Sequence, residues 1–184
     1  MLIVLSGLPG SGKTSLARAL VTAAGATHVR LDTVEQALVD AGTATHPVGP
    51  VGHYLARAVA GDLLRQGHLV VADGVNPLPV TRELWWAVAR AAGRPWLDVE
   101  VVCGDPALHR RWVQDRVADI PGHPEPTWAD VQSVDYAPWT SERVRVDTST
   151  TSAVQAAEVV MAHVRAQSSQ TIPTLPPTPE SAVE

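Results

Sequence analysis

The sequence predicts an α/β fold in which helices cover both faces of a five-stranded parallel sheet. Short apolar runs suited to buried strands alternate with segments whose apolar residues recur at helical spacing. Strands that alternate with helices in this way pair in parallel, because each crossover helix returns the chain to the same edge of the sheet. The predicted strands are residues 1–6, 27–31, 68–73, 96–103 and 143–147.

The predicted helices occupy the intervals between these strands. In residues 51–66 apolar side chains recur at helical spacing, and Gly67 ends the segment. Pro106 at a first turn and Thr127 at an N-cap position indicate the starts of two later helices. The other predicted helices begin near Ser15 or cover residues 34–40, 81–92, 105–117, 127–136 and 150–166.

Length and composition predict one globular domain followed by a short tail. The 184 residues are 45% hydrophobic and 18% charged, which is ordinary for a soluble domain with a real core. We expect this domain to cover residues 1–166. Residues 167–184 are rich in Ser, Thr and Pro and contain few large apolar residues, so we expect them to be disordered.

Charge, cysteine content and the N-terminal residues limit the classes of function. The net charge of −5 argues against a general nucleic-acid binder. Cys103 is the single cysteine, which excludes an internal disulfide or a cysteine zinc cluster and fits a reducing compartment. The chain starts on a core strand, which leaves no room for a signal peptide, and no apolar run approaches the ~20 residues of a membrane-spanning helix. We therefore expect a cytoplasmic protein without a membrane partner.

The most specific motif is GLPGSGKT, residues 7–14, between the first strand and the first helix. Strand, G-x-x-x-x-G-K-T and helix together are the pattern of the phosphate-binding P-loop, and a glycine-rich turn with a chance lysine is the alternative. Lys13, the only lysine, would reach the β- and γ-phosphates, and Thr14 would bind Mg²⁺. The predicted nucleotide-binding residues here are Gly7, Pro9, Gly10, Ser11, Gly12, Lys13, Thr14 and Ser15.

Two acidic residues follow predicted strands at the edge where ligands of parallel sheets bind. Asp32 follows the second strand, where a carboxylate can take the proton of an acceptor hydroxyl. Its alternative role is to cap a helix, because Asp32 and Glu35 have the spacing of a capping box. Asp73 ends the third strand in the Walker-B pattern and would hold Mg²⁺ or the acceptor, unless it only forms a turn with Gly74.

Further candidate residues lie on the remaining segments. Asn76 and His53 are candidates for substrate contact, although ordinary packing is the alternative for His53. Thr148 follows the fifth strand and would lie beside the nucleotide base, or its segment would cap the last helix. Residues 105–126 have the composition of a lid, an arginine-bearing helix followed by a Pro/Gly loop.

The lid arginines would bind phosphate charge and exclude water. They are Arg110, Arg111 and Arg116, of which Arg116 is nearest the loop. The alternative is a solvated helix face on which Arg111 pairs with Asp115.

The order of GLPGSGKT, RLDT, VVADG, DPALHRRWVQDR and VDTS over residues 1–165 resembles the small P-loop kinases. More narrowly, it is similar to the compact AAA-type phosphotransferases, which include chloramphenicol phosphotransferase and polynucleotide kinase domains, with zeta toxins more distant. The resemblance implies a P-loop NTPase three-layer sandwich with sheet order 2-3-1-4-5. It also implies ATP- and Mg²⁺-dependent transfer of the γ-phosphate to a hydroxyl, with the acceptor base on Asp32 and the lid role on Arg110, Arg111 or Arg116. With the P-loop motif, the expected catalytic residues are Lys13, Asp32, Arg111 and Arg116, and Arg110 is expected near the nucleotide.

The stretch after Asp32 bears on the acceptor. No Lys or Arg occurs between Arg30 and Arg57, and a wall without cations is a poor site for a phosphate. This favours an uncharged or weakly charged hydroxylated small molecule, such as an antibiotic, a nucleoside or another metabolite. The alternatives are a nucleotide or polynucleotide kinase, a slow nucleotide-dependent switch or ATPase, and a toxin that phosphorylates a sugar nucleotide. A monomer and a homodimer are both compatible with the sequence.

Overall fold

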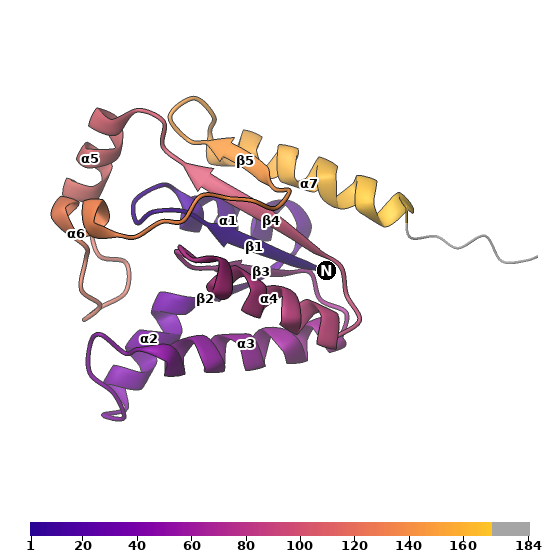
Figure 1. Cartoon of the computed structure of the whole chain (residues 1–184), viewed down its shortest axis with the longest axis horizontal. Coiled ribbons are helices and arrows are strands. Elements are labelled where there is room, and N and C mark those ends of the chain that lie inside the picture. Colours follow the sequence, from indigo (N-terminus) through magenta and orange to yellow (C-terminus); the bar gives the residue numbers. More distant parts are fainter. Residues whose placement is uncertain (171–184) are drawn as a thin grey trace, which may run out of the picture.

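The computed structural model describes residues 1–170 and contains a five-stranded, all-parallel sheet in the order β2-β3-β1-β4-β5 (Figure 1). The predicted order is confirmed. Because all strands run the same way, their carboxyl ends meet at one edge, and Arg30 lies opposite Asp73 in the register there. The strands are β1 Leu2–Ser6, β2 Thr27–Arg30, β3 Val70–Asp73, β4 Trp96–Val102 and β5 Val144–Asp147.

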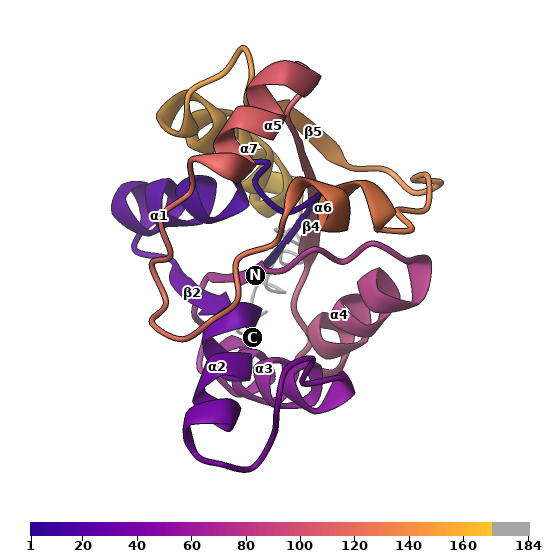
Figure 2. The same cartoon turned by 90° about the vertical axis from the view of Figure 1, so that its left-hand side faces the viewer.

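Helices cover both faces of the sheet (Figures 1 and 2). Two of them, α1 and α7, bury one core with Ile3 and Leu5 of β1, while α3 and α4 bury a second core with Leu2 and Val4. Side chains of a strand alternate between faces, so a strand covered on both sides is apolar throughout. The helices are α1 Lys13–Ala24, α2 Leu31–Asp40, α3 Pro50–Arg65, α4 Pro79–Ala91, α5 Pro106–Gln114, α6 Trp128–Ser133 and α7 Ala153–Gln170.

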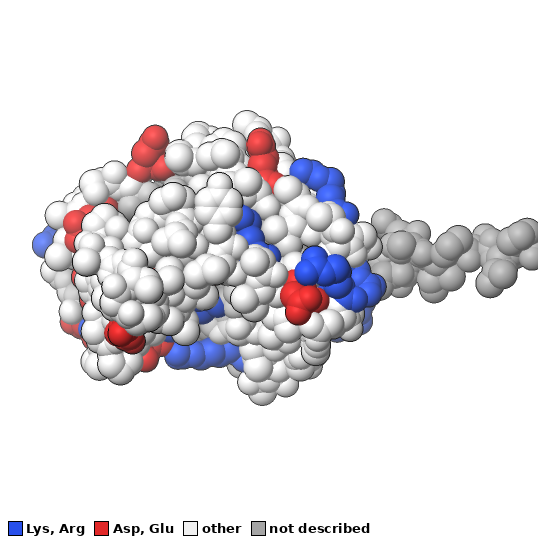
Figure 3. All heavy atoms as spheres, turned by 90° about the horizontal axis from the view of Figure 1, so that it is seen from below, with Lys and Arg blue, Asp and Glu red and all other residues white. Residues whose placement is uncertain are grey.

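The outer side of α3 carries few charged side chains, as the view from below shows (Figure 3). Tyr54 is 66% exposed there, and Val51, Leu55 and Val59 are also exposed.

Within the described residues, no helix has both the length and the apolar character needed to cross a membrane.

Several element boundaries differ from those predicted. Helix α2 begins at Leu31 and not at residue 34, because Arg30 is extended (φ −99°, ψ 121°) and the buried Leu31 anchors the first turn in the core. The predicted cap at Thr127 is confirmed by a capping box with Asp130, although α6 ends at Ser133. Helix α7 continues to Gln170, so the expected start of the tail at residue 167 was too early. The predicted disorder of residues 171–184 lies outside the described residues.

Candidate nucleotide and acceptor site

The P-loop curls between β1 and α1, and at two of its glycines neighbouring side chains leave little room for a Cβ atom. Gly10 and Gly12 have φ of 76° and 94°, in the region that favours glycine. A Cβ on Gly10 would lie 2.5 Å from Cγ2 of Val113, and one on Gly12 would lie 3.1 Å from Cγ2 of Thr148. The loop can therefore pass between the lid helix α5 and the segment after β5 only with glycine at these positions.

Lys13 is buried at the start of α1 and folds back over the loop. Its Nζ donates hydrogen bonds of 2.9 Å to the carbonyl oxygens of Gly7 and Leu8. Burial lowers the pKa of Lys13, and the nearby carboxylates of Asp73 and Asp32 partly counteract this. The ammonium group thus lies at the wall of a cavity, and its N–H groups donate to backbone carbonyl oxygens. Phosphate oxygens in the cavity can replace these carbonyl oxygens as acceptors.

Asp73, at the end of β3, binds two side chains through one carboxylate oxygen. Thr14 Oγ1 donates to Asp73 Oδ2 at 2.8 Å, and His28 Nε2 lies 3.1 Å from the same oxygen. Burial would raise the pKa of Asp73, but the hydrogen bond from His28, the charge of Lys13 and the hydrogen bond from Thr14 bring it below its ordinary value. Asp73 therefore stays ionised beside the P-loop. Sequence analysis did not identify His28, although it shares a face of β2 with Arg30, which lies opposite Asp73.

Asp32 lies in the first turn of α2 and lines the same cavity as Lys13. It is not an N-cap, since that position is Arg30 and no side chain caps this helix; the capping alternative is therefore wrong. The Asp32 side chain is 36% exposed, and its Oδ2 lies 3.5 Å from a guanidinium nitrogen of Arg30. Glu35 follows one turn later, where burial and the charge of Asp32 raise its pKa to about 7.

One cavity of about 1300 Å³ is lined by Lys13, Asp73, Asp32 and Glu35. It extends from the P-loop past Asp32 to the segment before α3 and is covered by the lid, here the chain between α5 and α6 together with α5. Such a volume exceeds that of an ordinary single-ligand pocket, which is roughly 300–1,000 Å³, so it can hold two ligands side by side. His53 of α3, a candidate for substrate contact, lines the cavity, and burial together with the charge of Arg57 lowers its pKa.

The lid crosses in front of the end of β2 and returns to α6 (Figure 2). Of the three predicted lid arginines only Arg116 lines the cavity, with its Nε 2.7 Å from Oε2 of Glu125. Arg110 and Arg111 are exposed and do not line it, because α5 turns His109 and Val113 inward instead. The solvated-face alternative therefore fits these two residues.

Asp119 of the lid was not identified from the sequence, yet it makes the densest set of ion pairs at the site. Its carboxylate accepts hydrogen bonds from Arg30 at 2.8 and 3.0 Å and from Arg18, and it lies 3.7 Å from Arg116. Hydrogen bonds from Arg30 hold the pKa of Asp119 well below its usual range. The partners lie 89 and 101 positions away in the chain, so no local pattern could indicate the contact.

Two predicted site residues have their side-chain polar groups bound within the protein and do not offer free groups to a ligand. The buried Asn76 donates from Nδ2 to the carbonyl of Leu5 at 2.9 Å and accepts from Trp85 at 3.0 Å, so the prediction that it contacts substrate is not supported. Thr148 Oγ1 lies 2.9 Å from the carbonyl oxygens of Ser11 and Val102, although the residue also lines the cavity. The cap of the last helix is supplied by Ser152.

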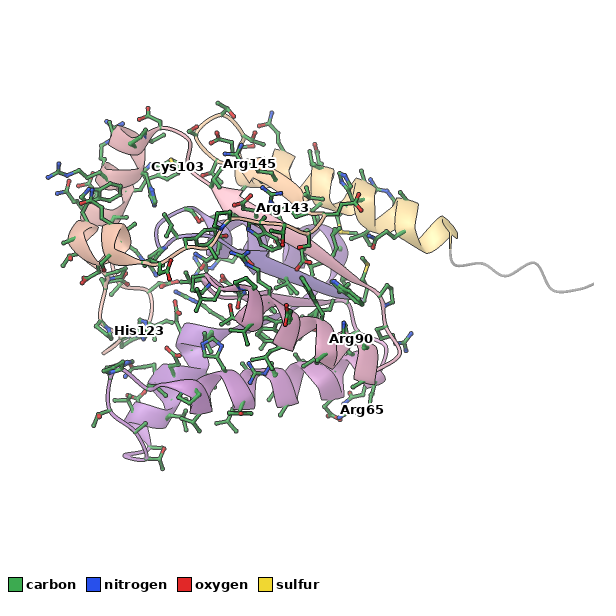
Figure 4. All side chains as sticks on the ribbon, viewed as in Figure 1. Arg65, Arg90, Cys103, His123, Arg143 and Arg145 are labelled. Atoms are coloured by element: carbon green, nitrogen blue, oxygen red, sulfur yellow. The ribbon has the colours of Figure 1, made fainter. Side chains whose placement is uncertain are left out.

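Two loops meet at the end of the cavity beside the segment before α3. His123, labelled in Figure 4, points from the lid toward the segment before α3, and its ring lies edge-on to His46 with centroids 5.0 Å apart. His46 Nε2 in turn lies 3.0 Å from Oε1 of the buried Gln36. In the part of the chain that the structure describes, no group of three or more His, Cys, Asp or Glu side chains is arranged to hold a metal ion.

Solved structures with similar folds are small P-loop proteins. A protein of Chloroflexus aurantiacus described as a candidate kinase has a TM-score of 0.72 at 18% identity, covering 90% of this chain and 96% of its own. The APS kinase of Mycobacterium tuberculosis, in complex with AMPPNP and APS, has a TM-score of 0.66 at 19% identity, with 89% and 96% covered. A gluconokinase of Sinorhizobium meliloti has a TM-score of 0.60 at 19% identity, with 92% and 97% covered.

These likenesses show the fold of the chain. Among curated proteins, no sequence is similar enough to count as a match. A family model described as an AAA domain matches residues 2–134, which is well over half of the chain and includes the P-loop, Asp32, Asp73 and the lid. The chain therefore belongs to the AAA domain family, with the fold of the small P-loop kinases.

Proposed function

We propose that this protein is an ATP- and Mg²⁺-dependent phosphotransferase that moves the γ-phosphate to a hydroxyl group of a small molecule. One observation carries the proposal: Lys13 and Thr14 of the P-loop and the carboxylate of Asp32 line one cavity. A phosphate-binding loop and a candidate base in a shared cavity suit direct transfer between two bound ligands.

The P-loop end would bind the triphosphate. Lys13 would exchange its bonds to backbone carbonyls for bonds to β- and γ-phosphate oxygens. Thr14 Oγ1 and Asp73 Oδ2, which are 2.8 Å apart, are oxygen donors of the kind that Mg²⁺ prefers, so these residues fit the ion. Mg²⁺ held by these residues would offset the negative charge of the phosphates.

The opposite end would bind the acceptor. Asp32, partly exposed in the cavity, would accept a hydrogen bond from the acceptor hydroxyl and take its proton as the hydroxyl oxygen bonds to the γ-phosphorus. The bond between the γ-phosphorus and the bridging oxygen of the β-phosphate breaks in the same step, and ADP leaves with that oxygen. Arg116 would bind the oxygens of the transferred phosphoryl group from the lid. The lid and the His46–His123 contact would keep water out of the cavity and so limit hydrolysis of ATP.

The similar structures support small-molecule acceptors. They include an APS kinase that binds AMPPNP and APS, and a gluconokinase. An antibiotic, a nucleoside or another hydroxylated metabolite is therefore preferred to a polynucleotide end as the acceptor.

A mass-spectrometric screen tests this function. The protein is incubated with ATP, Mg²⁺ and a panel of hydroxylated antibiotics, nucleosides, sugars, sugar acids and a 5′-hydroxyl oligonucleotide, in parallel with Lys13→Ala. We expect a phosphate adduct on a small molecule with the wild type and none with Lys13→Ala. An adduct on the oligonucleotide alone, or adducts of equal yield with both proteins, would contradict the proposal.

A further inference from the structure

We propose that Arg18, Arg30 and Arg116 form an oxyanion-binding subsite next to Asp32, and that Asp119 of the lid occupies this subsite until a ligand oxyanion replaces it. The three arginines come from α1, β2 and the lid and converge on one carboxylate. The assignment of the oxyanion to the acceptor or to ATP rests on the proposed function; the existence of the subsite does not.

Arg30 is the centre of the subsite. Its side chain is only 8% exposed, its Nε is buried without a hydrogen-bond partner, and its terminal nitrogens donate to both oxygens of Asp119. A buried guanidinium without an anion is strongly destabilising, so this position requires a negative partner in every state of the protein.

Besides the longer contact with Asp32 at 3.5 Å, the anionic partner of Arg30 is Asp119, which lies on a segment that a ligand could displace. Asp119 lies in the lid, on no helix or strand, and its side chain is 30% exposed and lines the ligand cavity. Two parallel N–H···O bonds to a planar fork are also how arginine binds phosphate, sulfate or carboxylate groups. Asp119 therefore binds Arg30 with the geometry that a phosphate, sulfate or carboxylate group of a ligand would use.

The local charges favour exchange when a ligand enters. Arg116 forms an ion pair with Glu125 and lies 3.7 Å from Asp119, so its positive charge is already paired with carboxylates of the lid. Lys13 lies within electrostatic range of both Arg30 and Arg116. A phosphate or other anion at this end of the cavity would repel the Asp119 carboxylate and attract the same guanidinium groups, and the departure of Asp119 would leave Arg116 paired with Glu125.

This subsite changes the expectation about the acceptor. The stretch from residue 31 to residue 56 has no Lys or Arg, which predicted an uncharged acceptor. The folded chain nevertheless brings Arg18 and Arg116 to the wall of the cavity from outside that stretch, and it places Arg30 directly behind Asp119. The ligand group we infer is an oxyanion, supplied either by the acceptor or by the γ-phosphate of ATP.

Sulfate binding by Asp119→Asn tests the proposal. Sulfate is titrated at constant ionic strength into protein saturated with Mg·ADP or with Mg·AMPPNP, so that the P-loop is filled in both arms. Loss of the Asp119 charge should tighten sulfate binding about tenfold or more, the size of one to two charge-assisted hydrogen bonds. Arg30→Gln in the Asp119→Asn background should abolish the gain.

The two arms identify the source of the oxyanion. A gain in both arms assigns the subsite to the acceptor, whereas a gain with Mg·ADP alone assigns it to the γ-phosphate. A gain in neither arm overturns the proposal. Asp119→Glu, which keeps the charge, and Asp115→Asn, which removes an exposed carboxylate at the end of α5, should bind sulfate like the wild type.

The measured quantity is the affinity for sulfate, which does not depend on whether the protein transfers a phosphoryl group. A protein that binds Mg·ADP and sulfate as expected but phosphorylates nothing would retain the subsite and refute the proposed function. If Asp119→Asn does not fold, as judged by circular dichroism, the wild type is compared with Arg30→Gln. Weaker sulfate binding by Arg30→Gln then supports the subsite, and equal binding overturns it.

Discussion

The two ends of the cavity satisfy their charges in different ways. At the P-loop, Lys13 is bound by backbone carbonyls and Asp73 by Thr14 and His28, all on elements packed against the core. At the lid, Arg116 is bound by Glu125, and Asp119 is bound by arginines of α1 and β2. The P-loop end is therefore fixed before ligand arrives, whereas the lid end is held by ion pairs that a charged ligand can compete for.

The largest expected effect comes from the fixed end. Lys13→Ala removes the only cation inside the P-loop and should lower the rate of ATP-dependent transfer by roughly 10³-fold or more. Steady-state assays of phosphorylated product measure this, with Arg110→Ala as the control, because Arg110 is exposed and outside the cavity. Wild-type rates in Lys13→Ala would refute the role of the loop.

Asp32→Asn tests the junction between the two ends. Its carboxylate is the proposed base, so transfer should fall by about 10²-fold or more while Mg·ATP binding stays unchanged. Isothermal titration and single-turnover rates separate the two effects. Because Asp32 is not an N-cap, its loss should change the melting temperature little; a large drop in melting temperature with transfer preserved would contradict this account.

Arg116→Ala tests the lid end and should have a smaller effect. Loss of this guanidinium should slow transfer by about 10- to 100-fold, because a charged donor to the transferred group is lost while the P-loop contacts remain. The matched control is Arg111→Ala, which lies on α5 in the same lid but outside the cavity and should transfer at the wild-type rate. Equal losses in both variants would mean that the lid acts through overall charge.

The smallest effect concerns Asp98 of β4, which lies outside both ends. Burial raises its pKa to about 6 despite the hydrogen bond from Trp86 at 3.0 Å. A raised carboxyl pKa makes the folded state bind a proton more tightly, so its contribution to stability is full at low pH and is lost as pH rises through about 6.

Asp98→Asn should therefore raise the free energy of unfolding near neutral pH by on the order of 2 kcal/mol and make it less dependent on pH. Urea unfolding at about pH 4 and at neutral pH checks this. Asp62→Asn on the surface of α3 is the control and should change neither value. An Asp98 variant that is less stable at neutral pH would show that the charge is required.

The two ends also differ in how well the sequence predicted them. The P-loop is one contiguous motif, and Asp32 and Asp73 follow strands whose ends share an edge, so local patterns place them together. The Arg30–Asp119 pair joins an edge strand to a loop 89 positions later, and no periodicity or motif signals such a pair. Arg110 and Arg111 show the converse error, since composition indicated an arginine-bearing helix but not which of its faces is buried.

The fate of the γ-phosphate tests the central claim most directly. ATP whose γ-phosphate carries heavy oxygen is incubated with Mg²⁺, the wild-type protein and a small-molecule extract, and the products are resolved by mass spectrometry. Transfer predicts labelled phosphate on a low-molecular-weight hydroxyl compound, with none in reactions with Asp32→Asn beyond roughly a hundredth of that amount. Label found only in inorganic phosphate, at equal rates with and without the extract, would contradict the account and identify an ATPase.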